Sequence, residues 1–139
     1  MSQENVGIVL RLYEGLNSPV SAYDVGDEVL SATFDPSIET VQLGALAGTR
    51  GTFVGFDGLR EAARELDDAW GDYRFELLEH AAEGNLVAFA VKAYASGRAS
   101  GISVGMDLGH LFELRDGRIV RWVVYSEPRD ALEAVGLSE

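Results

Sequence analysis

The chain has 139 residues, of which 47% are hydrophobic and 24% charged, and this composition is typical of one globular domain spanning residues 1–139. Eleven basic residues against 23 acidic ones give a formal charge of −12, which argues against nucleic acid and against anionic membrane surfaces as partners. The absence of cysteine excludes a disulfide framework, a thiol nucleophile and a cysteine-based zinc site. We therefore expect a soluble, cytoplasmic domain without a signal peptide or a membrane span.

Three segments have the apolar spacing of amphipathic helices, and turn residues bound them. They cover residues 3–17, 58–70 and 128–136. Asp57 is placed to cap the free N–H groups of the second segment, and Gly71 follows its last residue. The first helix is expected to bury one stripe of apolar side chains.

A shorter helix is predicted over residues 21–31, where the first residue is a serine suited to an N-cap. Its side chains Tyr23, Val29 and Leu30 are expected to be buried. Residues 44–55 contain four glycines in twelve positions, and we interpret them as a long irregular loop within the domain.

Most of the remaining chain has the two-residue period of β-strands and is rich in Val, Phe, Tyr and Leu. Five strands are predicted, over residues 38–42, 73–80, 86–96, 103–115 and 118–125. Glycine-containing turns join the last strands as antiparallel hairpins. A sheet of consecutive hairpins with helices covering one face is an α+β fold, and its concave side encloses a cone that can hold a ligand.

Five segments carry a family resemblance when they are taken in this order. They are MSQENVGIVLRLYEGLN, FDPSIE, FVGFDGLREAARELDDAW, GRASGISV and LFELRDGRIVRWVVYSEPRDALEAVGL, which together span nearly the whole chain. The chain thereby resembles the SnoaL-like branch of the nuclear transport factor 2-like superfamily, which includes the ketosteroid isomerases. The resemblance implies a cystatin-like, cone-shaped α+β barrel, in which a curved antiparallel or mixed sheet carries helices on its concave face. It implies no one function, because this fold hosts isomerases, cyclases, hydratases, epoxide hydrolases and non-catalytic binders.

Two active-site patterns of the superfamily are broken in this chain. At the position of the carboxylate base of ketosteroid isomerases stands Thr40, which cannot take a carbon-bound proton at neutral pH. The protonated acid of those enzymes corresponds to Gly109 or His110. The acid–base aspartate of the SnoaL-type polyketide cyclases corresponds to Val124. Neither mechanism is therefore carried over residue by residue.

His110 is the predicted catalytic residue. Strand alternation puts it on the core side of the sheet together with Leu108, Phe112 and Leu114. Burial would lower the pKa of this histidine and leave a neutral imidazole that can donate and accept a hydrogen. The alternative is a structural histidine that is hydrogen-bonded to a backbone carbonyl or to a neighbouring hydroxyl.

The same alternation assigns faces to the other polar strand residues. Asp107 points away from the core, unless a bulge at a neighbouring glycine reverses the strand. Glu39 also points outward, whereas His80 lies on the face opposite His110. Since these are the chain's two histidines and no carboxylate has suitable spacing, we expect no metal site.

Six further residues are expected to line the ligand pocket. They are Tyr13, Tyr23, Thr40, Trp70, Phe112 and Trp122. Most combine an apolar ring with one polar group, so they can enclose an apolar molecule and hydrogen-bond it. The alternative is that the aromatic side chains belong to the core.

Three functional hypotheses follow from this. The chain is a cofactor-free acid–base enzyme of isomerase, cyclase or hydratase type, a non-catalytic module for a hydrophobic ligand, or a structural domain whose cone is filled. We favour a small-molecule pocket of unassigned chemistry, with catalysis slightly ahead of binding alone. A homodimer through the convex sheet face is also expected, because residues 87–94 and 121–125 are apolar on both faces.

Overall fold

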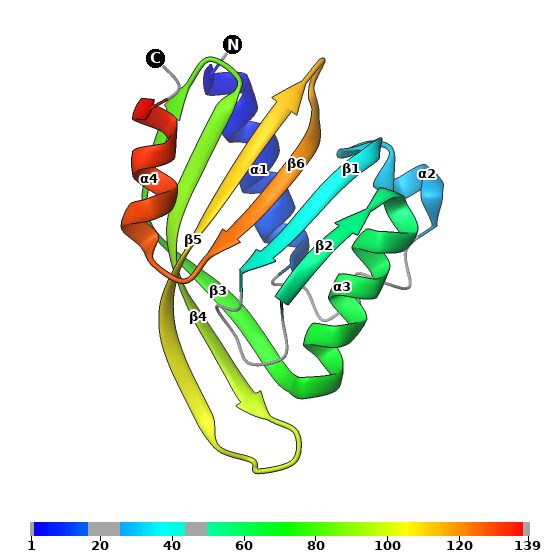
Figure 1. Cartoon of the computed structure of the whole chain (residues 1–139), viewed down its shortest axis with the longest axis vertical. Helices are drawn as coiled ribbons and strands as arrows, with labels where there is room; N and C mark the ends of the chain where they lie inside the picture. The colour runs from blue at the N-terminus through cyan, green and yellow to red at the C-terminus, as the bar shows by residue number, and fades with distance from the viewer. Residues whose placement is uncertain (1, 17–25, 44–49, 138–139) are drawn as a thin grey trace.

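The computed structural model describes residues 2–16, 26–43 and 50–137, which form four helices and one mixed sheet of six strands (Figure 1). The helices are α1 (Ser2–Leu16), α2 (Asp27–Leu30), α3 (Gly55–Ala69) and α4 (Pro128–Leu137). The strands are β1 (Phe34–Leu43), β2 (Arg50–Val54), β3 (Trp70–Glu83), β4 (Leu86–Gly97), β5 (Ser103–Arg115) and β6 (Arg118–Tyr125). None of these helices is long and apolar enough to cross a bilayer.

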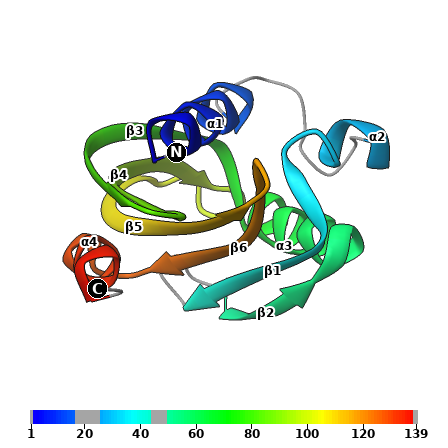
Figure 2. The ribbon, with the colours of Figure 1, turned by 90° about the horizontal axis from the view of Figure 1, so that it is seen from above.

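The strands lie side by side in the order β2-β1-β6-β5-β4-β3. β1 runs parallel to β6, and every other neighbouring pair is antiparallel. The sheet curls around α1, with α3 beside β1 and β2, while α4 packs on the outside of the curl (Figure 2). This is the cone-shaped α+β barrel with a curved mixed sheet that the sequence predicts.

β5 shows how the sequence gives the sheet two different faces. The strand pairs with β4 along its length without a register shift, so no bulge reverses its alternation. Leu108, His110 and Phe112 therefore point inward and are buried, whereas Asp107 points outward and is exposed. The predicted faces of His110 and Asp107 are confirmed.

The prediction that residues 44–55 form one irregular loop is wrong for their second half. Residues 50–54 form β2, which pairs antiparallel with β1 and places Phe53 opposite Thr40. Gly51 and Gly55, which looked like loop residues, adopt positive φ angles of 145° and 77° within and just after the strand. The sheet therefore has six strands instead of five, and residues 44–49 lie outside the described residues.

α4 covers part of the outer face of the sheet, although all helices were expected on the concave side. Ala88, Leu111 and Val123 from three neighbouring strands pack against Ala131 and Val135 of this helix. α4 thus covers part of the apolar outer face of the sheet, on which the expectation of a second subunit was based.

The helix ends also differ from the sequence prediction. α3 begins at Gly55 with Val54 as its N-cap, so Asp57 lies in the first turn and makes no capping bond. Gly136 lies within α4 instead of ending it. The predicted Ser21 N-cap lies outside the described residues, and α2 is described from Asp27.

The side-chain directions are mispredicted at two positions. Val29 is 61% exposed, although it was expected to be buried with Leu30, because α2 lies at the edge of the fold. His80 pairs with Phe89, which in turn pairs with His110, so both histidines belong to the inner face. A register shift between Leu77 and Glu79 reverses the alternation of β3 before His80.

Candidate functional site

A cavity of about 340 Å³ lies between the inner face of the sheet and helices α1, α2 and α3. Its walls are mainly apolar, and large side chains from α3 and from four strands form much of them. These side chains are Phe34, Leu59, Leu66, Phe75, Leu108, Trp122 and Val124. A concave apolar space of this size is typical of sites for small organic ligands.

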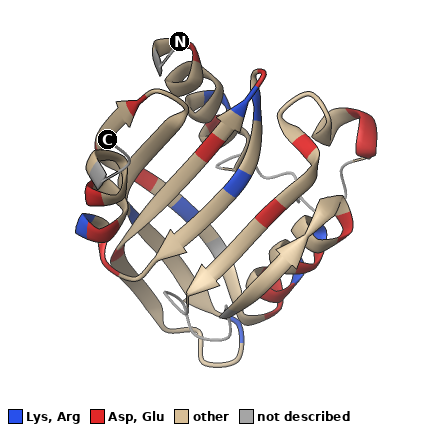
Figure 3. Ribbon diagram, turned by 45° about the horizontal axis from the view of Figure 1, so that its top comes forward, with Lys and Arg blue, Asp and Glu red and all other residues tan. Residues whose placement is uncertain are grey.

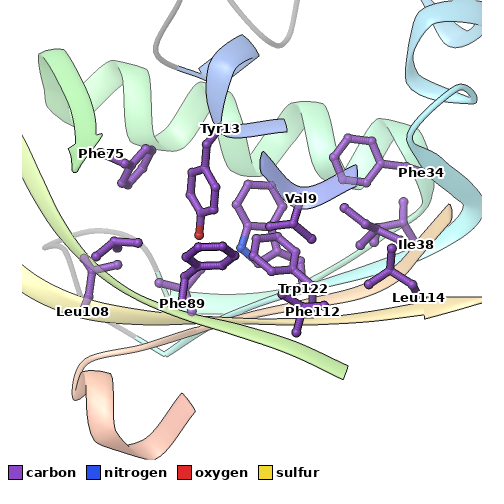
Figure 4. Packing of buried hydrophobic residues seen from close by; sticks show 14 of the residues in the cluster. Val9, Tyr13, Phe34, Ile38, Phe75, Phe89, Leu108, Phe112, Leu114 and Trp122 are labelled. Carbon is purple, nitrogen blue, oxygen red and sulfur yellow. The ribbon is translucent and has the colours of Figure 1, made fainter. Parts of the chain in front are cut away.

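Five of the predicted site residues meet at the sheet side of this cavity. Thr40, His110 and Trp122 line it, on the neighbouring strands β1, β5 and β6. Tyr13 and Phe112 are buried in the adjoining core and contact the imidazole of His110. In Figure 4, Tyr13 reaches from α1 toward the sheet, with its hydroxyl directed at the centre of the aromatic cluster.

The structure does not bring the other two predicted residues into this group. Trp70, at the start of β3, packs at the edge of the core and is not among the described residues that line the cavity. Tyr23 lies outside the described residues.

A hydrogen bond of 2.6 Å joins the Tyr13 hydroxyl to Nδ1 of His110. Burial raises the pKa of the Tyr13 phenol well above its ordinary value and lowers the pKa of His110 to about 3. Both groups are therefore neutral at pH 7. The hydrogen bond to the Tyr13 hydroxyl is what a structural role of His110 predicts. His110 also lines the cavity, as a functional role requires.

Aromatic rings hold this imidazole in place. The ring centroids of Phe75, Phe112 and Trp122 lie 5.3, 5.9 and 5.5 Å from that of His110, all with their planes steeply inclined to it. Such edge-to-face contacts fix the orientation of the imidazole and keep water away from it. The low dielectric of this environment explains why burial is the largest cause of the lowered pKa.

Two buried polar atoms at the cavity have no hydrogen-bond partner within the described residues. They are Oγ1 of Thr40 and Nε1 of Trp122. The two residues are register partners on the parallel strands β1 and β6. A buried polar group without a partner costs free energy, so this pair lowers the stability of the core beside the cavity.

Arginines line the cavity as well, on its helical side. Arg60 from α3 reaches Asp27 of α2 at 2.5 Å and Asp57 at 3.3 Å, which ties α2 to α3 beside the cavity. Arg11 of α1 is exposed. No carboxylate is among the described lining residues, although acidic side chains are frequent elsewhere, as along α3 (Figure 3). The cavity therefore differs in charge from the acidic surface around it.

Sequence reasoning did not single out Arg11, Arg60 and Gln42 as lining residues. Gln42 was within reach of the argument, because the alternation that turns Thr40 inward also turns Gln42 inward. The arginines carry no such signal, since a helical arginine is ordinarily solvated. Among the described residues, no three His, Asp or Glu side chains gather as ligands for a metal would.

Comparison with protein families finds the SnoaL-like domain, which matches residues 9–122. A comparison with curated protein sequences gives no significant match.

Solved structures resemble the whole of this fold. A protein from Jannaschia sp. CCS1 named as a SnoaL-like polyketide cyclase has a TM-score of 0.75 at 18% identity, with 96% of this chain and 92% of that chain covered. A nuclear transport factor 2-like protein of unknown function from Burkholderia pseudomallei K96243 has a TM-score of 0.75 at 17% identity, with coverage of 95% and 97%. TerC, co-crystallised with polyporic acid, has a TM-score of 0.73 at 21% identity, with coverage of 94% and 98%. Identities this low establish the fold and leave the function open.

Proposed function

We propose that this chain, which belongs to the SnoaL-like domain family, binds a small and mostly apolar molecule in its cavity. The observation that carries the proposal is an apolar space of about 340 Å³ whose sheet side is lined by Thr40, His110 and Trp122. Apolar walls with a few convergent polar groups are the usual composition of a ligand site. The co-crystallisation of TerC with polyporic acid gives further support, because TerC has a similar fold.

The cavity favours this function over a purely structural domain. A structural role predicts that side chains fill the cone, because protein interiors are close-packed and empty volume destabilises them. Here the aromatic residues Phe34, Phe112 and Trp122 pack on one another and still leave the space open beside them. The space is large enough for a molecule of two or three fused rings.

A second candidate function is catalysis, and the neutral His110 favours one type of it. With its pKa lowered to about 3, this imidazole is neutral at pH 7 and a weaker base than an ordinary histidine. A neutral imidazole can instead donate a hydrogen bond to an oxygen that becomes negative in the transition state. If a substrate is found, His110→Gln tests this role, and unchanged turnover in that variant would exclude it.

The binding function can be tested with the bicyclic hydrocarbon tetralin and with its ketone, 1-tetralone. Titration of the isotope-labelled protein is expected to give dissociation constants of about 0.1 mM for fragments of this size. Backbone amide shifts should be confined to residues around the cavity. Wild-type protein that binds neither probe would contradict the proposed function.

A matched pair of variants locates the binding site. Ala62 is buried on the cavity side of α3, so Ala62→Phe should fill the space and weaken both probes at least tenfold. Ala69→Phe makes the same change at an exposed position of the same helix and should leave binding unchanged. Equal effects of the two variants would place the probes elsewhere.

We also propose that the chain forms a homodimer through the part of the convex sheet face that α4 leaves uncovered. Its support is the pattern of residues 87–94 and 121–125, although α4 accounts for Ala88 and Val123. On the uncovered part, Tyr94 lies beneath the guanidinium of Arg74, 4.4 Å from the ring centroid. Sedimentation equilibrium at micromolar concentration should show a dimer, and a monomer throughout would refute the proposal.

A further inference from the structure

The part of the cavity wall that reaches solvent lies between α1 and α2. Arg11 and Gly15 of α1 and Val29 of α2 line the cavity and are exposed. The other described lining residues are buried or half-buried. Exposed residues that also line a cavity mark the place where it opens to water. The mouth of the cavity is therefore bordered by α1 on one side and by α2 on the other.

The short helix α2 has little contact with the rest of the fold. Its residues Asp27, Glu28 and Val29 are exposed, and Leu30 is buried in the core. Figure 2 shows the helix at the edge of the molecule, beyond β1 and α3. A helix of one turn has no stability of its own in water, so its position depends on these few tertiary contacts.

An ion pair that crosses from α2 to α3 is one of these contacts. Nη2 of Arg60 lies 2.5 Å from Oδ1 of Asp27, and Nη1 lies 3.3 Å from Oδ1 of Asp57. Since Asp57 and Arg60 are both on α3, the second contact orients the arginine and does not hold α2. The side chain of Arg60 is 15% exposed and lines the cavity, whereas that of Asp27 is 73% exposed. Arg60 thus connects α2 to α3 beside the mouth of the cavity.

The chain that follows α2 is fixed to the sheet. The backbone N–H of Ile119 donates to the carbonyl oxygen of Thr33 over 2.8 Å, and Phe34 is then buried at the start of β1. Ala32, between the helix and this anchor, is exposed. A movement of α2 can therefore be absorbed by residues 31–32 while the sheet keeps its shape.

We propose that α2 is a gate at the mouth of the cavity, held closed by the ion pair between Asp27 and Arg60 and hinged at residues 31–32. The inference rests on the proposed binding function and describes how a ligand enters the same site. Opening breaks the ion pair and takes Leu30 out of the core, so the closed state predominates. Because Asp27 is mostly exposed, the pair is weak and sensitive to salt, which allows the gate to open.

Amide hydrogen exchange of the whole chain measures the opening directly. The N–H groups of Leu30 and Ser31 donate to the carbonyl oxygens of Gly26 and Asp27, and these bonds are lost when the detached helix unfolds. Asp27→Asn and Arg60→Met should each speed the exchange of both amides about threefold. The double variant should exchange no faster than the faster single variant, because both changes remove the same ion pair. Equal protection in wild type and both single variants would overturn the gate.

Asp57→Asn is the matched control. It changes the other carboxylate on Arg60 in the same way and leaves the contact with α2 in place. The Leu30 and Ser31 amides should therefore exchange no faster than in wild type. High salt should speed their exchange in wild type and have little effect in Asp27→Asn. An increase in Asp57→Asn equal to that in Asp27→Asn would contradict the role of the ion pair.

Ligand kinetics test whether this movement controls entry. The NMR line shapes of a 1-tetralone titration give the association and dissociation rates. Because the gate opens for both entry and exit, Asp27→Asn should raise both rates about threefold and change the dissociation constant less than about twofold. Unchanged rates in this variant would overturn the gate and leave the binding function standing.

The outcomes distinguish this inference from the proposed function. If wild-type protein binds neither tetralin nor 1-tetralone, both fail. If 1-tetralone binds and its rates do not follow the exchange of the α2 amides, the cavity is a ligand site without this gate. A parallel rise of amide exchange and of both rates in Asp27→Asn, absent from Asp57→Asn, supports the inference.

Discussion

The two faces of β5 are built from alternate residues of one strand. The outer face packs closely against a helix, whereas the inner face borders a cavity. On the outer face, Gly109 lies so close to α4 that a Cβ added there would be 2.6 Å from Cβ of Ala131. Leu111 packs beside it against the same helix. On the inner face, Leu108 and His110 border an open cavity instead of a packed helix.

The difference separates residues that stabilise the fold from residues that carry function. The outer face has close packing and small side chains, as expected of a contact that stabilises the folded state. The inner face keeps an empty volume and unpaired polar atoms at Thr40 and Trp122, both of which lower stability. An empty volume of this kind is a cost typical of binding sites, which keep space for a ligand.

The largest loss of stability is expected when a side chain is added at the close contact between β5 and α4 on the outer face. In Gly109→Ala the new methyl group meets Ala131 as well as backbone atoms of Pro128 and Glu127, at 3.1 and 3.2 Å. α4 must move, which should lower the free energy of unfolding by about 3 kcal/mol. Urea denaturation measures this change.

Gly105→Ala is the matched control on the same strand and the same face. A Cβ there lies 3.4 Å from the nearest atoms, which belong to the long side chains of Lys92 and Tyr94. These can adjust, so stability should change by less than about 1 kcal/mol. Equal losses in the two variants would show that contact with α4 does not distinguish the sites.

A smaller effect is expected from pH on the inner face. Burial lowers the pKa of His110 to about 3, whereas an unfolded histidine titrates near 6.5, so the unfolded chain takes up a proton first. This contribution is complete above about pH 6.5 and is lost as the pH falls toward 3. At pH 5 it should reduce the free energy of unfolding by about 2 kcal/mol.

His110→Gln provides the comparison, because it removes this titration and leaves the carboxylates in place. The difference in unfolding free energy between wild type and variant should shrink by about 2 kcal/mol between pH 7.5 and pH 5. A difference independent of pH would mean that folding does not lower the pKa of His110.

The smallest effect is expected at Thr40. Thr40→Val removes a buried hydroxyl without a partner in the described structure and keeps its volume, so the ligand-free protein should gain about 1 kcal/mol. Thr52→Val makes the same substitution at an exposed position of β2 and should change stability by less than about 0.5 kcal/mol. A loss of stability in Thr40→Val would show that the hydroxyl is already satisfied.

The sequence predicts the pieces of the fold that depend on local pattern. The ends of β5 and β6 agree with the prediction, because strand alternation and the turn between Arg115 and Arg118 are local signals. β2 was missed because its pairing with β1 is a tertiary contact that outweighs its glycines. The face of His80 was mispredicted because one bulge in β3 reverses every later position.

The sequence predicted individual residues of the candidate site, but it did not predict the contacts between them. Alternation identified His110 and Thr40 as inward-facing, and both line the cavity. The bond between Tyr13 and His110 joins residues 97 positions apart and depends on how α1 packs into the curl. The unpaired state of Trp122 Nε1 is a property of the assembled core, which no sequence pattern encodes.

The most direct test follows the indole N–H resonances while 1-tetralone is added to the ¹⁵N-labelled protein. The chain has two tryptophans, and Trp70 serves as an internal control because it is outside the described cavity lining. Because Trp122 lines the cavity, the bound ketone should shift the resonance of its indole N–H and leave that of Trp70 in place. Binding of 1-tetralone with an unmoved Trp122 resonance would contradict the account.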